Sequence, residues 1–249
     1  MNPAQVAVIT GASQGIGAAT AKELSARGLA VVLAARTAAR LQELADALPG
    51  PSLVVPTDVK VRSEVDRLLS TALATFGHVD IWINNAGRGI SRSVAELSAA
   101  DLDEMMEVNV KAPLYGMQAV LPHFRARGTG TIVNVSSALS RLPFATYRSA
   151  YAAAKAALNS LTEQLRADLK RECPGLRVVT VLPGAVGTDF GHNALHGGID
   201  NRGLPNVQTA DEVASLIAQA ALSADGDVYT RTTFLERAVE HLRASASHI

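Results

Sequence analysis

Short apolar runs alternate with longer amphipathic stretches along most of this 249-residue chain. The apolar runs are rich in β-branched residues and mostly lack polar alternation, which is typical of strands covered on both faces. Strands are expected at residues 6–10, 30–34, 53–55, 80–83, 131–135, 177–181 and 227–230. Helices are expected at residues 16–27, 37–48, 62–76, 101–126, 150–172 and 210–222. Strand and helix in turn predict an α/β fold, with helices on both faces of a doubly wound parallel sheet of about seven strands.

Two segments depart from this rhythm. Residues 184–206 form a long stretch rich in Gly, Asn, His and Asp, and loops of that length in compact domains are often functional lids. Residues 233–245 carry an apolar stripe, and Thr233 and Glu236 are spaced as a capping box. We therefore expect a substrate lid and a terminal helix, the latter packed on the body or on another subunit. The sequence shows no repeat or linker, so residues 1–249 are expected to form a single domain.

The composition narrows the class of protein. Hydrophobic residues make up 48% of the chain, and 23 Lys and Arg residues balance 23 Asp and Glu residues. This balance favours a large buried core over disorder and argues against binding to nucleic acid or to an anionic membrane. No apolar run reaches the roughly 18 residues of a membrane span, and the N-terminus lacks the pattern of a secretory signal. The single cysteine, Cys173, allows no intrachain disulfide. The chain is therefore expected to be soluble and cytoplasmic.

A glycine-rich turn follows the first expected strand. Gly11, Gly15 and Gly17 lie between that strand and a helix N-terminus, where backbone N–H groups and the helix dipole favour an anion. Their spacing differs from the general dinucleotide fingerprint, so a purely structural turn remains open at this point. At the end of the second strand, Arg36 stands where NAD-binding folds carry a carboxylate. A guanidinium suits a 2′-phosphate, so Arg36 predicts NADP over NAD unless it is only a surface charge.

Candidate catalytic groups lie further along the chain. Tyr151 and Lys155 are four residues apart in an alanine-rich helical stretch and so share one face. An ammonium near a phenol favours the phenolate and suits tyrosine to general acid/base catalysis. Ser136 and Ser137 follow a strand, at the sheet edge where open α/β folds bind ligands. Taken singly, the Tyr–Lys pair can be surface packing and the serine pair a turn cap.

Taken together, these motifs resemble the short-chain dehydrogenase/reductase family. The similarity runs in order from Val6 to about Phe190. It is carried by Thr10, Gly11, Gly15, Gly17, Asp58, Asn84, Asn85, Ala86, Gly87, Asn109, Ser137, Tyr151, Lys155, Pro183, Gly184 and Thr188. The resemblance implies a Rossmann-type fold and an NADP(H)-dependent oxidoreductase that interconverts a carbonyl and an alcohol. It points to a 3-oxoacyl reductase-like branch, and to a homodimer or homotetramer in which the two long helices pair between subunits.

The resemblance also implies a role for each matching catalytic position. Tyr151 would donate its proton to the carbonyl oxygen during reduction, and Ser137 would orient and polarise that carbonyl. Lys155 would lower the pKa of Tyr151 and hold the nicotinamide ribose. Asn109 would position a water molecule that links Lys155 to solvent. A small carbonyl or alcohol compound is therefore the expected substrate.

A larger set is implied to bind NADP(H). Asp58 would bond adenine, Asn85 and Ala86 would line the adenosine ribose through their backbone, and Thr188 would fix the nicotinamide carboxamide. The full set is Gly11, Ser13, Gln14, Gly15, Ile16, Gly17, Arg36, Asp58, Val59, Asn85, Ala86, Gly87, Tyr151, Lys155, Pro183, Gly184 and Thr188.

The sequence also departs from the family pattern. Ser136 competes with Ser137 for the serine role, and the spacing from Ser137 to Tyr151 is one residue longer than is common. Ser140 stands where many relatives have glycine. The C-terminus lacks the Gly-Gly ending of many acyl carrier protein reductases, which argues against a role in fatty-acid synthesis.

Other candidate residues surround the expected pocket. His192 and His196 have helical spacing, but beyond the nearby Asp189 no third ligand is placed convincingly, so we expect no metal site and assign both to the lid. Four arginines flank the pocket and can attract an anionic substrate, although solvated or ion-paired side chains are the simpler interpretation: Arg88, Arg92, Arg141 and Arg148. An apolar pocket wall is expected from Leu139, Leu142, Phe144, Tyr147 and Phe190, some of which will be core.

Two other functions compete with the reductase. A non-catalytic NADP(H)-binding regulator would need only the nucleotide-binding half, so the intact Ser, Tyr, Lys and Asn argue against it. A nucleotide-sugar epimerase or dehydratase would carry a larger C-terminal substrate region. The sequence does not name the substrate, because specificity lies in the lid and the pocket walls.

Overall fold

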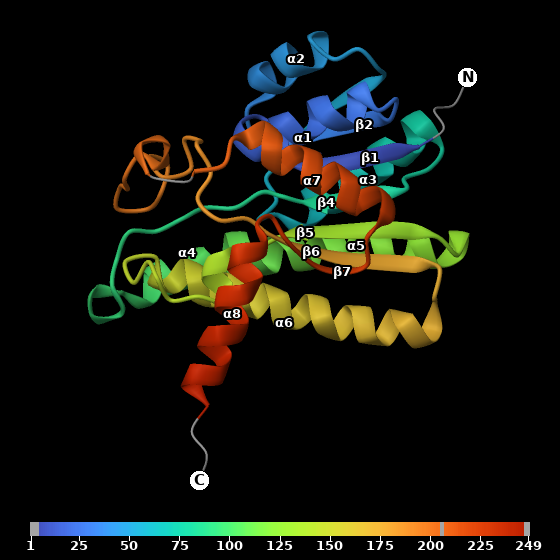
Figure 1. Ribbon diagram of the computed structural model, residues 1–249. Helices are drawn as coiled ribbons and strands as arrows, with labels where there is room; N and C mark the ends of the chain where they lie inside the picture. The colour runs from blue at the N-terminus through green and yellow to red at the C-terminus, as the bar shows by residue number, and fades with distance from the viewer. Residues whose placement is uncertain (1–4, 205–206, 247–249) are drawn as a thin grey trace.

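The computed structural model of the protein describes residues 5–204 and 207–246. Seven strands form one parallel sheet in the order β3-β2-β1-β4-β5-β6-β7 (Figure 1). They are β1 (Val6–Thr10), β2 (Ala30–Ala35), β3 (Ser52–Pro56), β4 (Ile81–Asn84), β5 (Gly130–Val135), β6 (Leu176–Leu182) and β7 (Gly226–Tyr229). Every strand lies within one residue of its expected bounds, and the predicted Rossmann-type α/β fold is confirmed.

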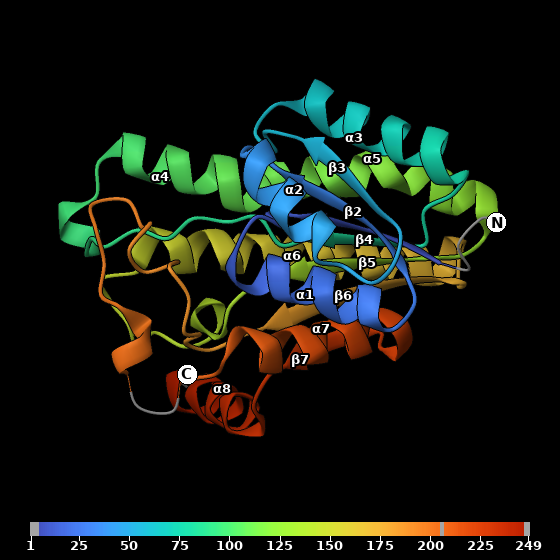
Figure 2. The same cartoon turned by 90° about the horizontal axis from the view of Figure 1, so that it is seen from above.

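Helices cover both faces of the sheet (Figure 2). One face packs against α1 (Gly15–Ala26), α2 (Ala38–Asp46) and α7 (Ala210–Ser223). The other packs against α3 (Arg62–Phe76), α5 (Ala112–Arg127) and α6 (Ser149–Glu172). Within the described residues, no helix is both long and apolar enough to cross a lipid bilayer.

The side chains of β1 alternate between the two faces of the sheet and pack against both helical layers. Ala7 and Ile9 belong to the core under α1 and α7, whereas Val6 and Val8 belong to the core under α3, α5 and α6. All four side chains are fully buried. Because successive strand residues point to opposite faces, a strand between two helical layers must be apolar at every position. All seven strands of the described residues thus belong to one sheet with a helical layer on each face. The one-domain organisation stays a prediction.

The long helix expected over residues 101–126 is interrupted. It begins earlier, as α4 (Ala99–Met106), and a π-helical segment (Glu107–Lys111) joins α4 to α5. Asn109 lies in that segment, and its Nδ2 donates to the Met105 carbonyl over 3.1 Å. In an α-helix this carbonyl would accept from the backbone N–H of residue 109, so the side chain replaces the main-chain donor. Such π-helical turns frequently occur at functional sites.

The expected lid is an irregular loop with one short 3₁₀ helix at Asn201–Gly203; Pro205 and Asn206, which belong to it, lie outside the described residues. Leu195 fixes the loop to the body. Its N–H donates to the Gly89 carbonyl over 2.8 Å, and its own carbonyl accepts from the Ser91 N–H over 3.0 Å.

The terminal helix α8 (Thr232–Ser245) begins one residue earlier than expected. Arg231 takes the N-cap position without a side-chain cap, so the predicted capping box of Thr233 and Glu236 is wrong. Thr233 already lies inside the first helical turn, whereas a capping side chain must come from the non-helical residue before it.

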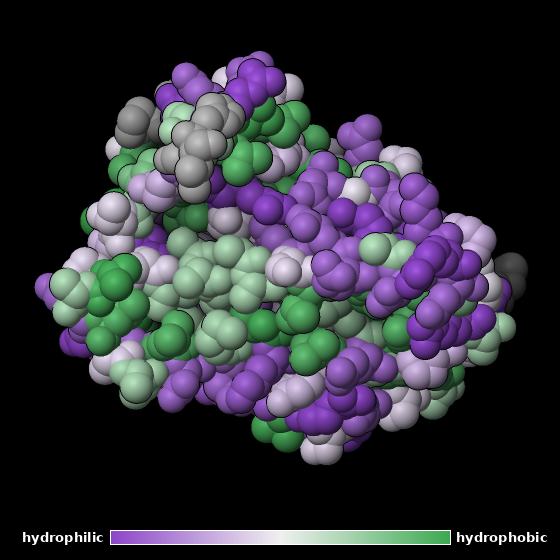
Figure 3. Space-filling view, turned by 90° about the horizontal axis from the view of Figure 1, so that it is seen from below, coloured by the Kyte–Doolittle hydropathy of each residue, from purple (hydrophilic) through white to green (hydrophobic). Residues whose placement is uncertain are grey.

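Only the start of α8 packs closely on the body, and the helix then extends away from it (Figure 1). The ring of Phe234 stacks on Phe144 with 6.5 Å between centroids. Leu235, Val239 and Leu242 are 47%, 41% and 74% exposed. On the side of the molecule where α6 and α8 lie, hydrophobic residues gather between hydrophilic ones (Figure 3). Packing of α8 on another subunit stays a prediction.

Candidate active site

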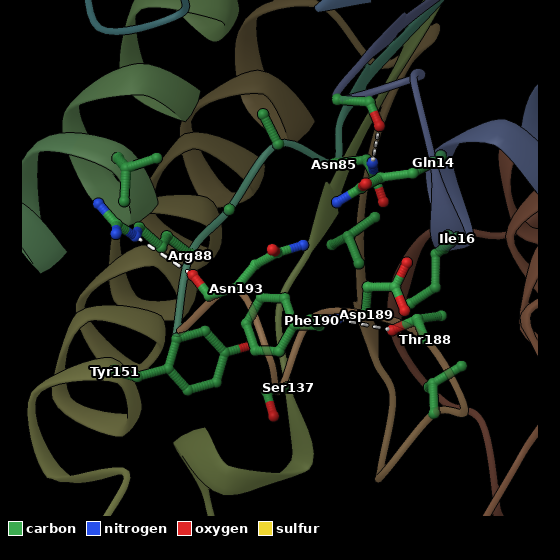
Figure 4. Close-up of a pocket in the computed structure, with 18 of the residues that line it drawn as sticks. Gln14, Ile16, Asn85, Arg88, Ser137, Tyr151, Thr188, Asp189, Phe190 and Asn193 are labelled. Atoms are coloured by element: carbon green, nitrogen blue, oxygen red, sulfur yellow. Dashed lines mark hydrogen bonds between the residues drawn. The ribbon is translucent and has the colours of Figure 1, made fainter. Parts of the chain in front are cut away.

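A cavity of about 810 Å³ opens at the carboxyl ends of β1, β4, β5 and β6. The strand order changes direction between β1 and β4, which is where open α/β sheets bind ligands. Every residue that the sequence assigned to NADP(H) lines this cavity, together with Ser137. Ser137, Tyr151 and Phe190 gather at one end, while Gln14, Ile16 and Thr188 lie at the other (Figure 4).

The glycine-rich turn leaves no space for side chains. Gly11 has φ +67° and Gly15 has φ +56°, a backbone conformation that favours glycine. A Cβ on Gly17 would lie 2.5 Å from Nδ2 of Asn85 and closer still to the Gly11 carbonyl oxygen. The turn thus opens the N-terminus of α1 to the cavity. This cradle fits the pyrophosphate of a dinucleotide, which needs close backbone approach and N–H donors.

Loop segments meet over this turn. Thr188 of the expected lid packs on Gly15, since a Cβ there would lie 3.3 Å from the Thr188 methyl group. From the other side, Oγ1 of Thr10 accepts hydrogen bonds from the N–H groups of Asn85 and Ala86, at 3.0 and 3.1 Å. Thr10 had no role assigned from the sequence. It positions the segment after β4 against the glycine-rich turn.

Two arginines stand at the end of β2. Arg36 is exposed and lines the cavity, as does Arg40 one helical turn later. Nη1 of Arg40 donates to Oε1 of Gln14 over 3.0 Å, so α2 is tied across the cavity to the glycine-rich turn. Sequence reasoning missed Arg40, which lies in the first turn of α2 and lines the same cavity as Arg36. Asp58, beyond β3, is half-buried in the same wall, and its Oδ1 accepts from the Lys60 N–H over 3.0 Å.

The tyrosine and lysine share one face of α6. Both side chains are buried, and Nζ of Lys155 lies 5.8 Å from the centre of the Tyr151 ring. Nζ also donates to the Val135 carbonyl over 2.8 Å. The ring of Phe190 tilts against Tyr151 with 5.4 Å between centroids. The lid, α6 and the end of β5 therefore meet around the Tyr151 hydroxyl.

The two candidate serines have different surroundings. Oγ of Ser136 donates to Oδ1 of Asn159 over 2.6 Å and is held inside the protein. Oγ of Ser137 accepts from the Leu139 N–H over 3.2 Å, and its hydrogen bonding with Tyr151 acts to lower the pKa of that phenol. Ser140, at the position where glycine is common, accepts from Nδ2 of Asn159 over 2.7 Å. This geometry favours Ser137 over Ser136 for contact with a substrate.

Asn109 does not line the cavity but lies directly behind it. Its Nδ2 donates to the Arg88 carbonyl over 2.9 Å, and its Oδ1 accepts from the Arg88 N–H over 3.3 Å. A Cβ on Gly87 would lie 3.0 Å from Oδ1 of Asn109 and 3.6 Å from Nζ of Lys155. Only a glycine therefore separates the two side chains, and the predicted link between them stays a prediction.

Burial dominates the titration of the tyrosine and the lysine. It raises the pKa of Tyr151 to about 12, against the opposing effects of Ser137 and of the Arg148 charge. It lowers the pKa of Lys155 to about 8. A desolvated ammonium is the less favoured form, just as a desolvated phenolate is. The groups that act to lower the pKa of Tyr151 here are Ser137 and Arg148, and the implied effect of Lys155 on that pKa stays a prediction.

The depressed pKa of Lys155 predicts a cost in stability. Below pH 8 the lysine is charged in both the folded and the unfolded chain, and the folded chain bears the full burial penalty. We expect Lys155→Met to raise the free energy of unfolding at pH 7 by about 1–3 kcal/mol, less than the full pKa difference because the bond to Val135 is lost. The gain should shrink as the pH rises from about 8 to 10.5, where the lysine becomes neutral.

Urea unfolding without added nucleotide, at pH 7 and pH 10, measures this effect. Lys170→Met removes an exposed lysine from the same helix and should change stability by less than about 0.5 kcal/mol. A Lys155→Met gain that is equal at both pH values contradicts the interpretation.

The four arginines expected to flank the pocket differ in whether they form ion pairs. Arg88 pairs with Glu104 at 3.4 Å, and Arg92 with Asp101 at 3.2 Å. Arg141 pairs with Glu163 and Asp227. For these three arginines the ion-paired interpretation is the correct one. Arg148 has no such partner among the described residues.

The expected apolar wall is present in part. Four of its five residues line the cavity, whereas Leu142 is buried elsewhere; the four are Leu139, Phe144, Tyr147 and Phe190.

The two histidines do not share a helix, because the chain from residue 189 to 196 is a series of turns. His196, with φ +62°, places Nε2 2.5 Å from Oδ1 of Asp101, and this contact with the help of Ser98 holds the pKa of Asp101 well below its usual range. In residues 5–204 and 207–246, no group of three His, Cys, Asp or Glu side chains is placed to hold a metal ion.

The fold and the cavity define a nucleotide-binding α/β protein of the oxidoreductase type, and comparison with known proteins gives its family. The family model for short chain dehydrogenases matches residues 5–197. The chain is 40% identical over 193 residues to the uncharacterized oxidoreductase SERP2049 of Staphylococcus epidermidis, covering 75% of this chain and 83% of that protein. The protein therefore belongs to the short-chain dehydrogenase family and is an oxidoreductase.

Solved structures agree with this assignment. A short chain dehydrogenase/reductase from Burkholderia phymatum, in complex with NAD, has a TM-score of 0.88 at 26% identity, covering 99% of this chain and 96% of that one. An alcohol dehydrogenase from Thermococcus sibiricus, complexed with 5-hydroxy-NADP, has a TM-score of 0.79 at 29% identity, covering 92% and 97%. Neighbours of this fold thus bind nicotinamide cofactors of both kinds.

Proposed function

We propose that this protein is an NADP(H)-dependent reductase that interconverts a carbonyl and an alcohol. The observation that carries the proposal is the meeting of Ser137, Tyr151 and Lys155 in the cavity that also holds the glycine-rich turn. Because these three side chains and the nucleotide-binding turn line the same cavity, the arrangement suits hydride transfer between a bound cofactor and a small molecule.

The proposed chemistry assigns one task to each side chain. A bound nicotinamide supplies or accepts the hydride. Tyr151 holds its proton at neutral pH, because burial raises its pKa to about 12, and donates that proton to the carbonyl oxygen during reduction. The Ser137 hydroxyl bonds the same oxygen and orients it. Lys155, fixed to the Val135 carbonyl over 2.8 Å, keeps a cationic group behind the phenol as negative charge develops there.

Steady-state kinetics tests this function. Oxidation of NADPH should be followed against ketones, aldehydes, quinones, steroids and 3-oxoacyl thioesters. Turnover of at least one carbonyl supports the reductase. Tight binding of NADPH without turnover on any of them would contradict it and favour a nucleotide-binding regulator.

Preference for NADP(H) over NAD(H) rests on Arg36 and Arg40. We expect the double variant Arg36→Met, Arg40→Met to raise the KM for NADPH by about 10- to 100-fold, since two charge-assisted hydrogen bonds to the 2′-phosphate are lost. The KM for NADH should stay within about threefold, because that cofactor carries no such phosphate. Arg27→Met, which removes an exposed arginine paired with Glu23 outside the cavity, is the control. Equal use of NADH and NADPH by the natural protein would contradict this preference.

Self-association belongs to the same proposal. Leu161 of α6 is 38% exposed, and α8, whose Leu235, Val239 and Leu242 are exposed, lies on the same side of the molecule as α6 (Figure 1). Burying these side chains between copies would stabilise a dimer or tetramer. Sedimentation equilibrium at micromolar concentration should give a mass of two or four chains, and a single-chain mass would contradict the assembly.

A further inference from the structure

Arg148 is a buried cation without an acidic partner. Its residue exposure is 5%, and no carboxylate of the described residues lies within ion-pair distance of its guanidinium. One N–H donates to the Ile90 carbonyl over 3.2 Å, and the guanidinium lies 5.4 Å from the centre of the Tyr147 ring. A guanidinium has several further donors, and a buried charge is costly unless it is paired. The donors of this guanidinium that do not bond Ile90 are therefore available to an anion.

Arg148 belongs to the Tyr151 end of the cavity. Arg148 is the N-cap residue of α6, three positions before Tyr151, and it lines the cavity. A Cβ on Gly89 would lie 2.9 Å from both Nη1 of Arg148 and the ring of Phe190. Phe190 in turn packs on Tyr151, and the Arg148 charge acts to lower the pKa of Tyr151. The positive charge thus lies next to Phe190, whose ring in turn contacts the Tyr151 ring.

Arg148 differs from the neighbouring arginines because they form ion pairs with acidic residues. Arg88 lines the same cavity but is paired with Glu104, and Arg202 on the lid is paired with Asp189 and Asp200. Their charges are already compensated by the protein. Of the arginines at the Tyr151 end, Arg148 is the one that the described residues leave without a carboxylate, whereas Lys155 is held by the Val135 carbonyl.

We propose that Arg148 binds a carboxylate of the substrate, which makes the substrate an oxo acid in reduction and a hydroxy acid in oxidation. The inference rests on the proposed function and adds the substrate class to it. A planar guanidinium matches a carboxylate through two parallel hydrogen bonds. Phe190 and Leu139, which line the cavity and pack on the cluster that contains Tyr151, provide an apolar wall for the carbon chain between the carboxylate and the carbonyl.

Kinetics with acids and their esters tests the proposal. The probes are 2-, 3- and 4-oxopentanoate, each beside its methyl ester, so that the chain length is fixed and the carbonyl moves relative to the charge. The natural protein should reduce the best acid with a kcat/KM at least about tenfold above that of its ester. Arg148→Met should lower kcat/KM for that acid by about 10²-fold, mainly through KM, and change the value for the ester by less than about threefold. Arg148→Lys, which keeps the charge, should recover part of the loss.

The control is Arg141→Met, which removes one positive charge from outside the cavity and should leave the ratio of acid to ester unchanged. NADPH titration of each variant reports whether the fold and the cofactor site are intact. Equal rates for acid and ester in the natural protein overturn the proposal. So does a parallel loss on both in Arg148→Met, which would identify a clamp between α6 and the lid instead.

A direct binding measurement separates this inference from the proposed function. If no carbonyl compound is reduced, calorimetry of pentanoate with the protein and NADP⁺ still tests the carboxylate site. Binding that is lost in Arg148→Met supports the site although the reductase proposal fails. No binding of pentanoate to the natural protein overturns it.

Discussion

Replacing Tyr151 with phenylalanine should lower kcat/KM for carbonyl reduction by about 10³-fold or more, while NADPH binding stays within about threefold. The substitution removes one hydroxyl group and keeps the ring. The ring contact with Phe190, 5.4 Å between centroids, and the buried position are retained. The loss should therefore fall on proton transfer and not on folding or on the cofactor.

A matched variant makes this test specific. Tyr115→Phe removes the same atom from a tyrosine of α5 that lies outside the cavity, with Arg62 5.8 Å above its ring. Its kcat/KM should equal that of the natural protein. Initial rates of NADPH oxidation measure both variants. More than about a tenth of the natural activity in Tyr151→Phe would show that another group supplies the proton.

The direction of the pH dependence follows from the same residue. Reduction needs the protonated phenol, and with a pKa of about 12 Tyr151 keeps its proton throughout the neutral range. Oxidation of the alcohol needs the phenolate as a base, and its fraction rises tenfold per pH unit below the pKa. The rate of oxidation should thus increase from pH 7 to pH 10, and Tyr151→Phe should abolish that increase.

The strands and the glycine-rich turn could be predicted because their signals are local. A strand such as β1, covered on both faces, must be apolar throughout, and this pattern is visible in the sequence itself. Gly11 and Gly15 likewise have positive φ, a property of the local backbone that favours glycine. The short-range sequence pattern was therefore sufficient for the sheet and for the expected nucleotide cradle.

Other features depend on contacts that the sequence does not display. The π-helical segment arises because the Asn109 side chain takes the Met105 carbonyl. The capping box failed because α8 begins one residue before Thr233. Four arginines looked equivalent in the sequence, and only the placement of the acidic residues separates Arg148 from the others. These ion pairs join residues of different segments, and the sequence alone does not show which acidic residue faces which arginine.

Replacing Gly17 with alanine should abolish measurable binding of NADPH at micromolar concentrations. The added Cβ would lie 2.5 Å from Nδ2 of Asn85 and closer to the Gly11 carbonyl oxygen. Either the glycine-rich turn or the segment after β4 must then move. Nδ2 of Asn85 donates to the Thr10 carbonyl over 2.9 Å, so the movement also breaks the tie between β1 and β4. The free energy of unfolding should fall by about 1–3 kcal/mol.

Gly203→Ala provides the matched comparison, because a Cβ at Gly203 meets no atom within 4 Å. Fluorescence titration with NADPH and urea unfolding should distinguish the two variants, with Gly203→Ala equal to the natural protein in both. Near-normal binding of NADPH by Gly17→Ala would mean that the backbone of the turn does not approach the pyrophosphate. The cradle would then have to lie elsewhere in the cavity, and the assignment of Gly11, Gly15 and Gly17 to the cofactor would fail.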